Sequence, residues 1–337
     1  MLVKQAGRGR HPVRRQLPQV CPHVGEHVVH PGDDVTTLTR GVSGPSAPGA
    51  LALHGDRTDP GTLRAALGDA EWDAVIDTWS GAPAVVRDSA TLLRDRAGHY
   101  GYVSSRSVYT WPVAVGLDES APVVDGDPAD TSSEDYAAAK RGGELAALAA
   151  FGDRAVLARA GLILGPYEIV GRMPWWLGRI ERGGDMLAPG PPDQPLQYID
   201  CRDLAAWMLS MADRGQGGTF NTVSEPGHTT MAGLLQAGIR VTGSDARLVW
   251  VSPEVIEAAG IEAWMELPVW APPDSEAAGL HGGNVDAAVA AGLACRPVEE
   301  TIAATWAWLQ AEGYPPPRPG IGLDPEKERQ VLEGLPG

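Results

Sequence analysis

Short apolar runs alternate with helical patterns along the first part of this chain. Runs of strand length and composition lie at residues 35–39, 51–54, 72–77 and 99–104. Between them, residues 62–67 and 84–97 carry apolar positions at helical spacing. Alternating strands and helices are typical of parallel βαβ units, in which ligands bind at the carboxyl ends of the strands. The pattern therefore predicts an α/β protein with a doubly wound parallel sheet.

The composition of the chain limits the kinds of molecule that it can be expected to bind. The chain has 337 residues, 43% of them hydrophobic, which is enough for one large domain or two. A net charge of −16 argues against nucleic acid and anionic membranes. Cys21, Cys201 and Cys295 are scattered and lack metal-ligand spacing, so we expect no metal site and a reduced, cytoplasmic setting. No apolar run approaches the ~20 residues that span a bilayer.

Residues 1–25 differ from everything that follows. They contain basic residues and prolines, no acidic residue and no apolar period. We therefore expect an atypical segment here, either disordered or produced by an out-of-frame gene start.

The sequence Tyr136-Ala-Ala-Ala-Lys140 places a phenol and an ammonium one helical turn apart. Residues four apart share a helix face, so both groups can point into one pocket. A phenol titrates near ~10, and a neighbouring ammonium lowers that pKa toward the range useful for proton transfer. Tyr-x-x-x-Lys alone also fits an ordinary helix surface, so its neighbours must decide.

A strand at 99–104 runs into Ser104-Ser105-Arg-Ser-Val-Tyr109, and Ser105 lies 31 residues before Tyr136. With this segment, the chain resembles the extended short-chain dehydrogenase/reductase superfamily, in its NAD-dependent epimerase/dehydratase-like branch. The resemblance implies a Rossmann-like fold in which Ser105 polarises a substrate oxygen and Tyr136 is the general acid/base. It also implies that Lys140 lowers the pKa of Tyr136 and holds the nicotinamide ribose. Ser104 is the alternative catalytic hydroxyl.

The resemblance covers roughly residues 32–310. Residues 154–166 look like the next strand and a Gly-Pro turn, and residues 197–205 are similar to the family's Ile-Asp-x-x-Asp-x-Ala segment. It implies a cofactor domain at 26–165 and 196–224, a smaller substrate lobe at 166–195 and 225–315, and a tail at 316–337. Asp203 fits the first turn of an ordinary helix equally well.

The family's glycine motif is missing. Gly-x-x-Gly-x-x-Gly lets the backbone approach the dinucleotide pyrophosphate at a helix N-terminus. Before the strand at 35–39, the chain offers only Gly7, Gly9, Gly25 and Gly32, without that spacing. A mis-framed start and genuine divergence with lost cofactor binding are the two competing explanations.

The candidate cofactor-binding residues follow the strand ends. An Arg after the second strand can accept a 2′-phosphate, so Arg40 favours NADP over NAD, although a solvated Arg is nearly as good an explanation. Asp56 matches the family's adenine-contacting acid or is a plain turn residue. Asp77 and Thr78 lie where the family's backbone passes the adenosine ribose. Lys140 is the last of the candidate cofactor-binding residues.

The sequence says less about the substrate-binding site. Trp175 could stack on a flat or sugar substrate, although core packing is the commoner role of a buried Trp. Arg172 and Arg296 could bind the phosphates of a nucleotide sugar, or could be surface or ion-paired residues.

Together these residues predict an NAD(P)-dependent reductase or epimerase that transfers a hydride at a hydroxyl- or carbonyl-bearing carbon of a small molecule. A family member that has lost its cofactor and acts as a binding or regulatory scaffold is the alternative. An RNA-binding relative fits the acidic charge poorly. Helix packing in the family implies a homodimer.

Overall fold

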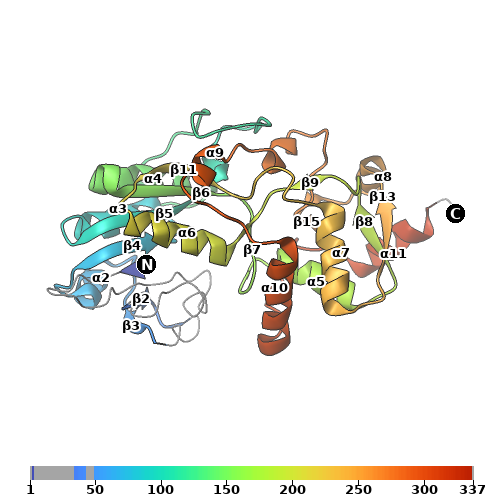
Figure 1. Cartoon of the computed structure of the whole chain (residues 1–337), viewed down its shortest axis with the longest axis horizontal. Coiled ribbons are helices and arrows are strands. Elements are labelled where there is room, and N and C mark those ends of the chain that lie inside the picture. Colours follow the sequence, from blue (N-terminus) through green and yellow to red (C-terminus); the bar gives the residue numbers. More distant parts are fainter. Residues whose placement is uncertain (1, 4–33, 43–48, 336–337) are drawn as a thin grey trace.

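The computed structural model describes residues 2–3, 34–42 and 49–335. A seven-stranded sheet with the order β11-β6-β5-β4-β1-β2-β3 forms one half of the molecule (Figure 1). Its strands are β1 (Leu2–Val3), β2 (Thr36–Thr39), β3 (Leu51–His54), β4 (Trp72–Asp77), β5 (Ala97–Ser105), β6 (Ala155–Ala160) and β11 (Gly218–Thr222). The pairs β2–β3, β4–β5, β5–β6 and β6–β11 are parallel. The predicted doubly wound parallel sheet is confirmed.

Strand β1 is the exception to the parallel arrangement. Leu2 is paired with Thr37 of β2 on one side and with Ile76 of β4 on the other, and both pairings are antiparallel. The sequence did not predict a strand here, because two residues show no period. The four glycines considered for a phosphate loop lie outside the described residues.

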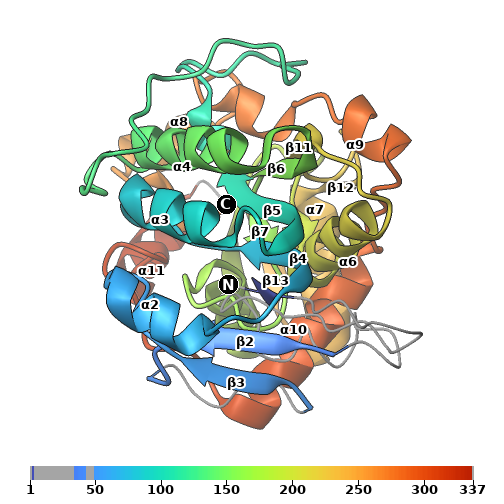
Figure 2. The ribbon, with the colours of Figure 1, turned by 90° about the vertical axis from the view of Figure 1, so that its left-hand side faces the viewer.

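Helices cover both faces of this sheet (Figure 2). α2 (Pro60–Leu67), α3 (Pro83–Leu93) and α4 (Tyr136–Phe151) lie on one face, and α6 (Cys201–Asp213) lies on the other. The apolar sides of α3 and α4 pack with Val75, Tyr100 and Leu157 of the sheet. The apolar side of α6 packs with Val103 and Val156. Burial of these amphipathic faces holds the carboxyl edge of the sheet in place.

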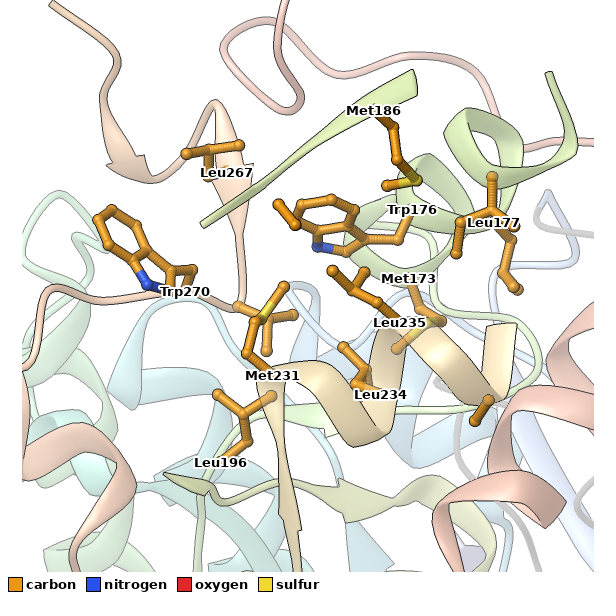
Figure 3. Packing of buried hydrophobic residues seen from close by; sticks show 14 of the residues in the cluster. Met173, Trp176, Leu177, Met186, Leu196, Met231, Leu234, Leu235, Leu267 and Trp270 are labelled. Carbon is orange, nitrogen blue, oxygen red and sulfur yellow. The ribbon is translucent and has the colours of Figure 1, made fainter. Parts of the chain in front are cut away.

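The other half of the molecule has its own core (Figure 1). It contains α5 (Arg172–Glu181), β8 (Asp185–Pro189), α7 (Met231–Thr242), β13 (Arg247–Val251), α8 (Pro253–Ala258), α10 (Val298–Glu312) and α11 (Pro325–Glu333). Strands β8 and β13 pair in parallel. Figure 3 shows the centre of this core, where Trp176 and Trp270 are almost fully buried among Met and Leu side chains. Their indole N–H groups donate to the backbone oxygens of Pro268 and Gly190.

The remaining described elements are short. These are η1 (Arg106–Val108), η2 (Gly152–Arg154), β7 (Ile163–Leu164), β9 (Pro195–Leu196), β10 (Ile199–Asp200), β12 (Thr229–Thr230), β14 (Ala263–Trp264), β15 (Leu267–Pro268), η3 (Ala278–His281) and α9 (Asp286–Ala290). Within the described residues, no helix combines the length and apolar character that a bilayer span requires.

The segment expected to be a tail contains helix α11, which docks on the second core. Glu328 is buried and accepts hydrogen bonds from the Arg179 guanidinium at 2.7 and 2.8 Å and from the Leu187 backbone N–H at 2.9 Å. These contacts tie α11 to both α5 and β8.

Candidate functional site

The carboxyl end of β5 and the first turn of α4 bring Ser105 and Tyr136 together. Ser105 is the last residue of its strand, and α4 starts at Tyr136 because the Asp135 carboxylate caps it, accepting from the Ala138 N–H at 3.0 Å. Tyr136 is 47% exposed, and loss of part of its water shell raises the pKa of the phenol more than the nearby Ser105 hydroxyl and the Arg172 charge lower it. The phenol is therefore protonated at neutral pH.

Lys140 lies one turn further along α4 and is almost fully buried. Its ammonium donates to the backbone oxygens of Trp79 and Val103, both at 2.7 Å. Burial lowers the pKa of Lys140 to about 8, although the charges of Asp77 and Glu144 act in the opposite direction.

Lys140 is not among the groups that set the pKa of Tyr136 in this structure, and its expected effect on the phenol stays a prediction. The pKa of Tyr136 is raised, and the groups that lower it are Ser105 and Arg172. The physical reason is the direction of the Lys140 side chain, which runs inward to two backbone carbonyls that use two of its three hydrogens.

Ser104 and Ser105 have different surroundings. Ser104 is buried and its hydroxyl donates to the Glu144 carboxylate at 2.7 Å. Arg159 binds the same carboxylate through two bonds of 2.9 and 3.0 Å, and Arg141 adds another of 2.9 Å. Ser104 is thus part of an internal ionic network. Ser105 is half-buried at the strand end, where its hydroxyl donates to the Ser107 hydroxyl and accepts from the Ser107 N–H, both at 3.1 Å, and its role toward a substrate stays a prediction.

Asp77 ends β4 inside a second buried network. Its carboxylate accepts two bonds from Arg57 at 2.6 and 2.5 Å, one from the Tyr100 hydroxyl at 2.5 Å and one from the Trp79 backbone N–H at 2.9 Å. Burial opposes ionisation, yet the charge and hydrogen bonds of Arg57 hold the pKa of Asp77 well below its usual range. The carboxylate is therefore used inside the protein. The half-buried Thr78 and the local backbone are what this strand end offers to a ligand.

Arg40 and Asp56 lie at the carboxyl ends of β2 and β3. Arg40 is exposed, whereas Asp56 accepts from the Thr58 hydroxyl at 2.7 Å and from its backbone N–H at 2.9 Å. Those bonds lower the pKa of Asp56, and the charge of Arg40 adds to the effect. The two candidates thus share one corner of the sheet.

The three substrate-side candidates have different environments. Arg172 begins α5 within electrostatic reach of Tyr136, and its buried Nε has no hydrogen-bond partner in the described structure. Trp175 is half-buried, 4.6 Å from Trp176 between ring centroids, and packed against Gly322.

Arg296 does not join these groups. Its guanidinium binds Asp203 at 2.6 and 2.9 Å and lies 3.7 Å from Asp200. Asp200 in turn caps α6 by accepting from the Arg202 backbone N–H at 2.8 Å. Of the explanations open for Arg296, the structure shows the ion pair.

Sequence reasoning missed Arg57, Glu144 and Arg159, because their partners are distant in the chain and no motif contains them. In the part of the chain that the structure describes, no group of His, Cys, Asp or Glu could hold a metal ion.

The comparisons with known proteins show the family of the chain and its fold. The model of the NAD dependent epimerase/dehydratase family matches residues 20–222. The chain belongs to that family. It is an extended short-chain dehydrogenase/reductase with a Rossmann-like fold, as its motifs indicated. None of the curated proteins compared with it matches the sequence.

Solved structures show the same fold. WbmH of Bordetella bronchiseptica, in complex with NAD+, has a TM-score of 0.63 and 18% identity, over 86% of this chain and 95% of WbmH. WbmG of the same organism, with NAD and UDP, has a TM-score of 0.58 and 17% identity, over 86% and 90%. UDP-glucose 4-epimerase of Thermotoga maritima, with UDP-glucose, has a TM-score of 0.61 and 16% identity, over 88% and 98%.

Proposed function

We propose that this family member is an NAD(P)-dependent reductase or epimerase that transfers a hydride at a carbonyl- or hydroxyl-bearing carbon. The placement of Ser105 at the end of β5 and of Tyr136 in the first turn of the adjoining helix α4 carries the proposal. It brings an oxygen-binding hydroxyl and a proton donor to the sheet edge where ligands of such folds bind.

The residues at this edge suit a nicotinamide dinucleotide at two points. Lys140 has a third ammonium hydrogen beyond the two that its carbonyl partners use, and a ribose hydroxyl can accept it. Arg40 is exposed at the end of β2, where a cation can pair with a 2′-phosphate, so we infer a preference for NADP. The dinucleotide supplies the hydride donor or acceptor.

Proton transfer belongs to Tyr136. Because its pKa lies above the ordinary value, the phenol is protonated at neutral pH and can give its proton to a carbonyl oxygen. Ser105 can donate a hydrogen bond to the same oxygen and stabilise the charge that develops there.

The substrate class follows from Arg172 and Trp175. Arg172 lies 4.0 Å from the Glu168 carboxylate and keeps an Nε without a hydrogen-bond partner in the described structure, which suits a phosphate, and the neighbouring indole suits a flat or sugar ring. The solved relatives include structures with UDP and with UDP-glucose. We therefore propose a nucleotide sugar as substrate, without a role for Arg296.

Replacement of Tyr136 with Phe tests the proposal. Loss of the hydroxyl removes the proton donor, so we expect turnover to fall about 10²–10⁴-fold while cofactor affinity stays within a factor of about two. Oxidation of the reduced nicotinamide, followed by its ultraviolet absorbance with a panel of nucleotide sugars and simple ketones, gives the rate. Unchanged turnover in Y136F contradicts the role of Tyr136.

A further inference from the structure

Arg106 follows Ser105 directly and is a buried cation in η1 with 6% of its surface exposed. Its Nη1 donates to the backbone oxygen of Leu280 at 3.0 Å and lies 3.4 Å from the Gln197 side-chain oxygen. Its Nη2 donates to the backbone oxygen of Gly279 at 3.1 Å. All three acceptors are neutral.

The absence of an acid distinguishes Arg106 from the other buried arginines of the described structure. Arg57 pairs with Asp77, Arg159 with Glu144, and Arg179 with Glu328. Burial of a guanidinium without a carboxylate is costly. Other interactions must therefore compensate for the burial of Arg106, and the positions of its hydrogen-bond acceptors indicate what these interactions hold together.

Two of the three acceptors of Arg106, the backbone oxygens of Gly279 and Leu280, belong to one segment, residues 279–283, and lie 173 and 174 positions away in the chain. Gly283 packs so tightly on the guanidinium that a Cβ at this position would overlap Nη2. The Gln197 side chain completes the junction. It donates to the Gly283 backbone oxygen at 2.9 Å and accepts from the Gly283 N–H at 2.7 Å.

The same segment is held from its other side. The Gly116 N–H donates to the Gly282 oxygen at 2.6 Å, and the Asn284 N–H donates to the Leu117 oxygen at 2.8 Å. His281 is buried, accepts from the Gln197 N–H at 3.0 Å and lies 2.8 Å from the Val269 oxygen. Residues 279–283 are thus fixed between the loop that follows β5 and the second half of the molecule. Arg106 is the link to the strand that carries Ser105.

We propose that Arg106 is a positioning residue that clamps residues 279–283 to the carboxyl end of β5 and thereby holds Ser105 beside Tyr136. The inference rests on the proposed function and adds Arg106 as the residue that keeps Ser105 and Tyr136 aligned. A planar guanidinium directs several donors outward in a rigid fork, which a lysine ammonium on a flexible stem cannot reproduce. The fork rather than the charge is the essential property.

The variants R106K and R106Q test this. R106K keeps the charge and loses the fork, whereas R106Q loses both. We expect kcat to fall roughly ten- to a hundredfold in both, because a misplaced catalytic group costs rate rather than affinity, while KM and the cofactor Kd change little. We also expect amide hydrogen exchange to become faster in residues 279–283. Wild-type kcat or unchanged exchange in R106K overturns the proposal.

Arg154 supplies a matched control. Its guanidinium also has neutral acceptors, the backbone oxygens of Ala97 at 2.6 Å, Gly98 at 3.4 Å and Arg94 at 3.1 Å, and lies 4.8 Å from the centroid of the Phe151 ring. It does so at the amino end of the same strand, away from Ser105. We expect R154Q to leave kcat and the exchange of residues 279–283 unchanged. An equal loss of kcat in R154Q overturns a specific role of Arg106.

A second pair of variants leaves Arg106 intact. G283A pushes a methyl group against the guanidinium, whereas G282A places it near the exposed side chain of Val115, which can move away. We expect G283A to reproduce the R106Q effects and G282A to resemble wild type. Amide hydrogen exchange can be measured on a protein that has no activity, so the two proposals can fail separately. Absence of activity in the wild-type protein refutes the proposed function. Unchanged exchange in R106Q and G283A refutes the role of Arg106 in holding residues 279–283.

Discussion

Adjacent serines at the end of β5 illustrate how one position along a strand changes the role of a side chain. Successive side chains point to opposite faces. Ser104 therefore faces Glu144 in the interior, whereas Ser105 lies at the open edge beside Tyr136. The sequence predicted that one of the two serines meets Tyr136. It could not show that Ser104 is engaged by Glu144, forty positions along the chain.

The variants S104A and S105A should separate these roles. S104A removes a hydrogen bond to a buried carboxylate, so we expect unfolding free energy to fall by about 1–3 kcal/mol with turnover nearly intact. S105A should reduce turnover by a factor of about ten or more, and should lower the unfolding free energy by about 1 kcal/mol because it removes the local bonds with Ser107. Urea unfolding and steady-state kinetics on both proteins provide the check. The reverse pattern assigns the catalytic hydroxyl to Ser104.

The buried ammonium of Lys140 should limit activity at alkaline pH. Its pKa is lowered to about 8, so the charged form is present below that pH and is lost above it. We expect kcat/KM to decline above pH about 8. K140R stays charged throughout, so its decline should begin at higher pH, at a reduced overall rate. A K140R profile with the wild-type alkaline limb contradicts the assignment.

At the scale of elements, local patterns predicted β2, β3, β4, β5, α2 and α3 to within a few residues, because each has its own apolar period. Contacts between distant segments were not predictable in this way. The Arg57–Asp77 pair joins the ends of two strands, and Glu328 of α11 reaches Arg179, 149 positions earlier. The residues of α11 therefore looked like a tail.

Helix α11 should contribute substantially to stability. E328A leaves the Arg179 guanidinium and the Leu187 N–H buried without their partner, so we expect a loss of about 3–5 kcal/mol of unfolding free energy. E333A is the control, because Glu333 pairs with Arg329 on the exposed side of the same helix. Its unfolding midpoint in urea should match wild type. Equal midpoints for E328A and wild type contradict the docking role of α11.

At the scale of the whole molecule, two halves with separate cores meet at the carboxyl edge of the parallel sheet. Ser105, Tyr136, Lys140 and Arg172 gather there, and Arg40 and Asp56 lie at the ends of β2 and β3. The parallel direction of the long strands followed from the alternating pattern, whereas their order in the sheet comes from the structure. The antiparallel two-residue β1 did not, because its partners specify it rather than its own sequence. The homodimer stays a prediction.

Binding of reduced nicotinamide dinucleotide to the purified 337-residue chain tests the central claim most directly. Isothermal calorimetry with NADPH and NADH should show saturable binding at one site, tighter for NADPH by roughly a factor of ten, because a charge-assisted contact with Arg40 contributes about 1.5 kcal/mol or more. NADH binding as tight as NADPH binding contradicts the inferred preference for NADP. No binding of either dinucleotide contradicts the proposed enzyme and favours the scaffold.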